Sequence, residues 1–308
     1  VMLDQSEFGL YTAKRDIESI MDNEHLHVTI TSSLGSVINQ SYMEKVIISN
    51  EVETIYHAAA YKHVSLVEDN IIEGLRNNSI GALYTAKAAV LANVKDFILI
   101  STDKAVNTAS VMGASKRLAE MTLQAMQVVS DTTNFSMVRF GNVLGSSGSV
   151  VPLFLEQIDA GGPVTVTHPE VSRYFMTIAE AATLVMQAAS MAEGGDVFLL
   201  DMGKPIRIMD LAERMIRLKG YSLRDEQNPM GDIEIQISGL KPGEKLHEEL
   251  VTNSQLFSTS HRKIMRARET FISWGDLSQH LESIEDACES RNEGRVQQLL
   301  RDLFNISI

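Results

Sequence analysis

The chain has 308 residues, which suffices for one large domain or for a core that carries a smaller lobe. Its 27 Lys and Arg against 40 Asp and Glu give a formal net charge of −13. No basic block interrupts this acidic background, so binding to a nucleic-acid backbone is disfavoured. The single cysteine, Cys288, excludes an internal disulfide, and no run of about 18 uncharged apolar residues could span a bilayer.

Short apolar runs with strand character alternate with longer helical patterns in the first half of the chain. The predicted strands cover residues 28–30, 54–57, 97–101 and 135–140, and the predicted helices cover 79–92 and 114–127. Such βαβ alternation predicts an α/β fold with a doubly wound, parallel sheet of Rossmann type.

The elements become shorter after about residue 141. Strands are predicted at 164–166, 197–200 and 233–237, with helices that begin at Ile178 and Ile208. Thr177 followed by Glu180 is a capping box, which sets the start at Ile178. We therefore expect a sheet domain over 1–140, a smaller α/β lobe over 141–270 with segments that return to the core, and a helical segment of unknown role over 271–308.

One block of polar residues stands where open α/β sheets bind their ligands, at the carboxyl end of a central strand. Ser101, Thr102, Asp103 and Lys104 follow the strand predicted at 97–101. Met112 and Lys116 come four residues apart at the start of the next helix and share a face. Taken singly, Asp103 would be expected to cap a turn and Lys116 to be a solvated lysine.

Six motifs in register identify a family. They are His57–Val64, Arg76–Asn78, Ser101–Val106, Val138–Val150, Ser172–Thr177 and Lys241–Lys245. Together they resemble the UDP-N-acetylglucosamine 4,6-dehydratases of bacterial polysaccharide biosynthesis and protein glycosylation, in the extended short-chain dehydrogenase/reductase superfamily. That superfamily usually has Tyr where this chain has Met112. The Met is typical of the large branch, which has an N-terminal membrane region and retains the configuration at C5 of the sugar.

The resemblance implies a lyase reaction with NAD as cofactor and UDP-N-acetylglucosamine as substrate. Hydride leaves C4, water is eliminated across C5 and C6, and the hydride returns to C6. Asp103 would be the acid at O6 and Lys104 the base at C5, which predicts a pKa of Lys104 below its ordinary value. Met112 has no titratable proton, so Thr102, Asp103 or a water relayed to Lys116 would accept the proton from O4.

The resemblance also assigns the binding residues. Those expected at the cofactor, with Asp4 at the adenosine ribose favouring NAD over NADP, are Asp4, Ser6, Ser36, Val37, Ala58, Ala59, Ala60, Lys62, Asn77, Ser101 and Lys116. Those expected at the substrate are Lys62, Thr102, Asn142, Val164, Thr165, Arg173, Met176, Pro242 and Glu244, and no metal site is expected.

Other functions stay open at this point. Within the enzyme class they are a C5-inverting dehydratase and a UDP-sugar 4-epimerase, although an epimerase is expected to have Tyr at position 112. From another class, the chain could be a non-catalytic dinucleotide-binding scaffold. Extended short-chain enzymes usually form homodimers or higher homo-oligomers through two helices, here expected at 75–93 and 112–129.

The start of the chain lacks a motif that a complete Rossmann domain is expected to have. No Gly-x-Gly-x-x-Gly occurs, yet Asp4 lies where that loop is expected about 20 residues upstream. We therefore expect the first strand, the Gly-rich loop and the first helix of the Rossmann domain to be missing, together with a membrane anchor before them. The fragment itself is expected to be soluble, and the whole protein to lie at the cytoplasmic side of the bacterial inner membrane. A polypeptide that begins at Val1 is expected to bind NAD poorly.

Overall fold

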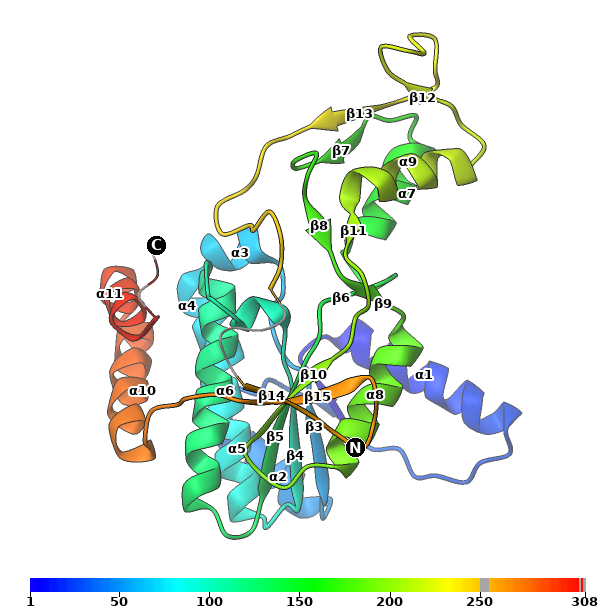
Figure 1. The fold of residues 1–308 in the computed structure, drawn as a ribbon. Helices are drawn as coiled ribbons and strands as arrows, with labels where there is room; N and C mark the ends of the chain where they lie inside the picture. The colour runs from blue at the N-terminus through cyan, green and yellow to red at the C-terminus, as the bar shows by residue number, and fades with distance from the viewer. Residues whose placement is uncertain (250–254, 305, 307–308) are drawn as a thin grey trace.

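A parallel sheet forms the centre of the molecule. The computed structural model describes residues 1–249, 255–304 and 306. Its six-stranded sheet is shown in Figure 1 and runs in the order β14 (Gln255–Ser258), β15 (Ile264–Arg268), β10 (Asp196–Leu200), β5 (Asn134–Arg139), β4 (Asp96–Ile100) and β3 (Thr54–His57). In this sheet β3, β4, β5 and β10 run parallel to one another. β15 pairs antiparallel with β10, and β14 pairs antiparallel with β15. The predicted α/β class with a parallel central sheet is therefore confirmed.

Helices cover both faces of this sheet, and the alternation of side chains along β4 explains why. Phe97 and Leu99 enter one core, whereas Ile98 enters the core on the other face. The first core is closed by α2 (Gln40–Ser49), α3 (Val64–Glu68), α4 (Ile71–Leu75), α5 (Gly81–Leu91) and α6 (Val111–Val129). The second is closed by α8 (Ile178–Ser190), whose predicted start is confirmed because the Thr177 hydroxyl accepts a hydrogen bond from the Glu180 amide.

The first two strands form a separate pair. β1 (Met2–Asp4) runs parallel to β2 (Ser32–Leu34), with α1 (Glu7–Asn23) between them in the chain. The strand predicted at 28–30 is wrong, because the residues that pair with β1 lie at 32–34. Among the described residues no strand joins β1 to β3, and a cavity lined by both strands lies between them.

A smaller lobe follows β5. Its sheet has the order β12 (Leu223–Arg224), β13 (Ile233–Ile237) and β7 (Val164–Val166), and its helices are α7 (Val150–Asp159) and α9 (Ile208–Leu218). Two small strand pairs stand between the lobe and the main sheet in Figure 1, namely β6 (Asn142–Val143) with β9 (Phe175–Met176), and β8 (Ser172–Arg173) with β11 (Ile206–Arg207). The segment after β13 then returns toward the main sheet, which brings residues of the lobe to the end of β4.

The C-terminal helices α10 (Trp274–Glu289) and α11 (Glu293–Phe304) form a hairpin on the outer side of α4 and α6 (Figure 1). Leu277, Leu281 and Ile284 are buried in the same core as Leu118 of α6. Helices at 75–93 and 112–129 were expected to mediate dimerisation. The chain's own hairpin packs against α6, and dimerisation through these helices stays a prediction. Across the described part of the chain, no helix combines the length and the apolar character that crossing a membrane requires.

Candidate active site

The end of β4 turns directly into a charged cluster. Thr102 caps the 3-10 turn Asp103–Ala105, and its hydroxyl donates to Oδ1 of Asp103 at 2.8 Å. Lys104 Nζ lies 3.1 Å from the same oxygen. The other oxygen of Asp103, Oδ2, is buried without a partner in the described structure. The predicted Asp-Lys pair is therefore a real contact at the carboxyl end of a central parallel strand.

Helix α6 packs against this turn at close range, and Gly113 makes the approach possible. A Cβ at Gly113 would lie 2.3 Å from the carbonyl oxygen of Lys104, a distance no ordinary contact allows. Ser110 caps the helix by accepting from the Gly113 amide at 3.0 Å. The cap and the glycine together fix the first two turns of α6, which carry Met112 and Lys116, beside Lys104.

Met112 and Lys116 line one cavity of about 360 Å³ together with Thr102, Lys104 and Asn142. Lys116 is almost fully buried and its Nζ donates to the carbonyl oxygen of Ile100 at 2.7 Å. Burial lowers the pKa of Lys116 to about 8, although the nearby Glu120 carboxylate acts in the opposite direction. Part of the Lys116 population is therefore neutral close to physiological pH.

The predicted low pKa of Lys104 is wrong for this arrangement. Burial would lower the pKa, but the carboxylates of Asp103 and Glu248 outweigh it and raise the pKa above the ordinary value for lysine. Glu248 Oε1 lies 3.1 Å from Lys104 Nζ, which the sequence reading did not anticipate. Lys104 is consequently an ammonium held between two carboxylates.

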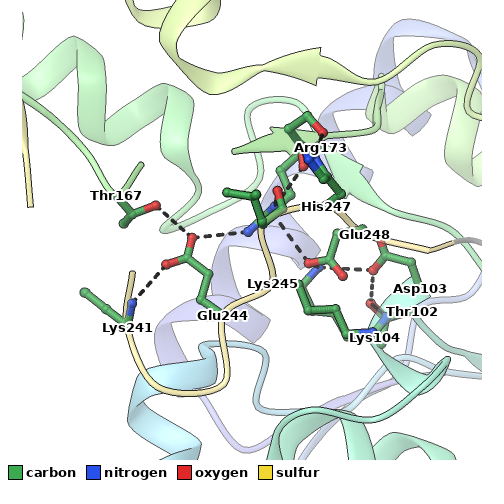
Figure 2. Close-up of polar contacts among 12 residues, drawn as sticks. Thr102, Asp103, Lys104, Thr167, Arg173, Lys241, Glu244, Lys245, His247 and Glu248 are labelled. Atoms are coloured by element: carbon green, nitrogen blue, oxygen red, sulfur yellow. Dashed lines mark hydrogen bonds and ion pairs between the residues drawn. The ribbon is translucent and has the colours of Figure 1, made fainter. Parts of the chain in front are cut away.

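Glu248 also connects this cluster to Arg173 on β8, as Figure 2 shows. Its Oε1 lies 3.6 Å from Nε of Arg173, whose Nη2 lies 3.2 Å from Glu244 Oε1. The Thr167 hydroxyl donates to the same oxygen of Glu244. Glu248 was missed because it follows the Lys241–Lys245 motif by three residues, and only the folded chain brings it to Lys104.

A second buried ionic network lies behind Ser101 and was also missed. The Ser101 hydroxyl donates to Glu120 at 2.6 Å, and Arg139 at the end of β5 contacts both Glu120 and Glu269. Burial alone would raise the pKa of Glu120, but Arg139, Arg117 and Ser101 lower it to about 2. The permanent charge of Glu120 is thereby fixed beneath Ser101, one turn along α6 from Lys116.

Most of the residues expected at the cofactor line two adjoining cavities. One, of about 480 Å³, is lined by Asp4, Ser36, Val37, Ala58, Ala59, Ala60 and Asn77. The other contains Lys62, Ser101 and Lys116, and both cavities share Ala58, Ala60 and Tyr61. Ser6 lines neither cavity, because its hydroxyl caps α1 by accepting from the Gly9 amide.

The residues expected at the substrate are less closely grouped. Lys62, Thr102 and Asn142 line the cavity of Lys116. Val164 and Met176 are almost fully buried in hydrophobic cores, so their side chains are not available to a substrate in this arrangement. Thr165 bonds to Gln157, and Pro242 forms an exposed turn before Glu244.

The family of polysaccharide biosynthesis proteins matches residues 1–269. This chain belongs to that family. It is 46% identical over 269 residues to the capsular polysaccharide biosynthesis protein CapD of Staphylococcus aureus, a match that covers 87% of this chain and 43% of that protein. The chain thus spans less than half the length of the curated relatives it matches first.

Solved structures show the same fold. Pen from Bacillus thuringiensis is 30% identical with a TM-score of 0.75, over 91% of this chain and 88% of Pen. The UDP-glucose 4-epimerase of Thermus thermophilus, solved in complex with NAD, is 17% identical with a TM-score of 0.65, over 76% of this chain and 86% of the epimerase. At 17% identity the second similarity concerns the fold alone.

Proposed function

We propose that this chain forms the catalytic part of an NAD-dependent 4,6-dehydratase that converts UDP-N-acetylglucosamine to its 4-keto-6-deoxy derivative. The observation that carries the proposal is the Asp103–Lys104 pair, at 3.1 Å, placed beside a cavity that also holds Lys116 and Met112. An elimination across C5 and C6 needs an acid and a base on neighbouring carbons, which such a pair supplies. Membership of the polysaccharide biosynthesis family supports a nucleotide sugar as substrate.

The residues around the two adjoining cavities fit a nicotinamide dinucleotide. Asp4 offers a carboxylate to ribose hydroxyls, and the small side chains of Ala58, Ala59 and Ala60 let a flat, extended ligand lie against the backbone. His57 Nε2 and the Lys116 ammonium add polar atoms near the shared wall, and burial together with Lys116 lowers the pKa of His57 to about 3. NAD, when bound, would supply the acceptor and later the donor of the hydride.

The Asp103–Lys104 pair can serve the elimination without a low pKa for lysine. The Lys104 ammonium donates one of its protons in a hydrogen bond to Oδ1 of Asp103, with 3.1 Å between Nζ and Oδ1. Transfer of that proton to Asp103 gives a neutral amine and a carboxylic acid, which are the base for C5 and the acid for the leaving hydroxyl.

The thioether of Met112 is not a base and cannot take the proton from O4, so another group must accept that proton. Thr102 and Lys116 line the cavity, and the pKa of Lys116, lowered to about 8 by burial, makes its neutral form accessible. We assign this step to Lys116, either directly or through a water, with Thr102 as the hydroxyl that orients O4.

The test is to incubate the purified enzyme with UDP-N-acetylglucosamine and NAD and to follow the nucleotide sugar by mass spectrometry. The expected product is lighter by one water. NMR of this product reports the configuration at C5, which the Met112 branch is expected to retain. An isomer of unchanged mass would instead identify a 4-epimerase, and bound NAD without any product would identify a non-catalytic scaffold.

A further inference from the structure

Two cations of the candidate site, Lys104 and Arg173, are each paired with carboxylates of the chain itself. Glu248 is almost completely buried, with only 2% of its side chain exposed. Its Oε1 lies 3.1 Å from Lys104 Nζ and 3.6 Å from Arg173 Nε. In Figure 2 the Glu248 carboxylate stands between the two cations.

The chain holds Glu248 in that place through the residues before it. The Ser172 amide donates to the carbonyl oxygen of Leu246 at 3.1 Å, and the Ser172 hydroxyl bonds to His247 Nδ1 at 2.8 Å. Arg173 Nη1 donates to the carbonyl oxygens of Ser172 and Leu246. The segment that carries Glu248 is therefore fastened to β8 directly beside Arg173.

The carboxylate is not fully satisfied by these contacts. Glu248 Oε2 is buried and has no hydrogen-bond partner in the described structure. A buried carboxylate with a free oxygen is costly to maintain for stability alone. Among the residues that the structure describes, Lys104 and Arg173 are the cations that balance its charge.

We propose that Glu248 is the internal counter-ion of the substrate site, which neutralises Arg173 and Lys104 when no substrate is bound and competes with the diphosphate of the nucleotide sugar for Arg173. This inference rests on the proposed function, since it takes a uridine diphosphate group as the anion that Arg173 binds. Glu248 acts through Arg173 and Lys104 and is a positioning residue. Its carboxylate determines how much a phosphate anion contributes to the binding affinity of the site.

The experiment compares binding of UDP and of uridine to the purified enzyme by calorimetry. Glu248→Gln removes the charge and keeps the shape, so we expect UDP to bind about fivefold more tightly, the size of one partly screened charge pair. Uridine carries no phosphate, and its affinity is expected to stay unchanged. The matched control is Glu249→Gln, because Glu249 is the exposed neighbour and contacts Asn107 rather than the two cations.

A double-mutant cycle tests the shared carboxylate. In the wild type, Lys104→Gln removes one of the two cations that pair with Glu248 in the described structure, so Glu248 is expected to hold Arg173 more strongly and UDP binding to weaken. In the Glu248→Gln background the same Lys104→Gln change is expected to have a smaller effect. Equal effects in both backgrounds would mean that Lys104 acts on UDP without Glu248 and would overturn the proposal.

Other outcomes are equally decisive. UDP affinity that stays at the wild-type value in Glu248→Gln would overturn the counter-ion role, while turnover of UDP-N-acetylglucosamine would leave the proposed function intact. If Glu248→Gln lacks a cooperative melting transition, Glu248→Ala is measured in its place. Failure of both variants to fold would assign Glu248 to stability and refute the inference. An enzyme that binds no UDP at all would refute the inference and the proposed function together.

Discussion

Lys104 is the residue on which the proposed elimination depends, because its Nζ donates a proton in a hydrogen bond to Oδ1 of Asp103 at 3.1 Å. Lys104→Gln removes that proton and the base, so turnover is expected to fall by about a hundredfold or more. Product formation from UDP-N-acetylglucosamine measures the loss. Lys87→Gln, an exposed lysine on α5, serves as the control. Near-normal turnover of the Lys104 variant would rule out this assignment.

Lys116 makes the stability of the protein depend on pH. Burial lowers its pKa from 10.5 to about 8 in the folded state. Between pH 8 and pH 10.5 the unfolded chain keeps a proton on Lys116 that the folded chain has lost. The contribution of Lys116 to the free energy of unfolding therefore rises with pH, by about 3 kcal/mol over the whole window.

Chemical denaturation at pH 8 and pH 10.5 measures this rise, and Lys116→Met is the reference variant. The difference between wild type and variant is expected to grow in favour of the wild type as the pH increases. A difference that shrinks or stays constant over this window would contradict the neutral, buried state of Lys116.

Met112 is expected to act through its shape. It is almost completely buried and lines the cavity beside Lys116, and it has no proton to exchange. Met112→Leu conserves volume, so kcat is expected to stay within about threefold of the wild type. A loss as large as that of Lys104→Gln would show that the sulfur itself takes part.

The sequence predicted the site where its residues are contiguous and missed it where they are not. Thr102, Asp103 and Lys104 follow one strand, so a strand prediction suffices to place them. Glu248 lies 144 positions after Lys104 and reaches it only through the contact of residues 246 and 247 with β8. The predicted pKa shift of Lys104 had the wrong sign for that reason, since the second carboxylate was not known.

At the scale of elements, sequence periodicity predicted where the helices lie but not their exact ends or their π-helical segment. The helix predicted at 114–127 extends over Val111–Val129. The one predicted at 79–92 begins within the π-helical segment Arg76–Ile80, which leads into α5. Asn78 from this segment bonds to the backbone of Tyr61 and to the Ser115 hydroxyl. Such a segment depends on these tertiary contacts, which a period of 3.6 residues does not encode.

The contact between α6 and the Lys104 turn can be tested at Gly113. A Cβ there would come within 2.3 Å of the Lys104 carbonyl oxygen, so Gly113→Ala must push the helix away from the turn. We expect a cost of about 1–3 kcal/mol in stability and a fall of about tenfold or more in kcat. Thermal unfolding and turnover measure both effects.

Gly275→Ala is the matched control, because Gly275 also begins a helix and its Cβ would find nothing closer than 3.9 Å. It is expected to leave turnover unchanged. Equal behaviour of the two alanine variants would mean that the close approach of α6 does not position Lys104.

At the scale of the whole molecule, the described residues form a two-stranded sheet that is separate from the six-stranded one. Within the described ranges β1 pairs with β2 alone and the main sheet ends at β3, with a cavity between the two edges. The Gly-rich helix start that usually cradles a dinucleotide pyrophosphate does not occur in the sequence. Weak binding of NAD by a polypeptide of these 308 residues stays a prediction, which calorimetry with NAD can decide.

The C-terminal hairpin determines which surface α6 presents. Its Leu281 is 2% exposed and packs in the core shared with α6. Leu281→Asp places an unpaired charge there, which is strongly unfavourable, so the hairpin is expected to detach and leave an apolar helix face uncovered. We expect this variant to self-associate, with a larger mass than the wild type in sedimentation at equal concentration.

The control is Gln279→Asp, which introduces the same side chain at an exposed position of α10. It is expected to keep the mass of the wild type. If Leu281→Asp also kept that mass while circular dichroism showed that the hairpin had melted, α6 would not be a self-association surface. The hairpin would then cover α6 in order to stabilise the single chain. Any oligomer of the protein would have to form through a face other than the one predicted from the sequence.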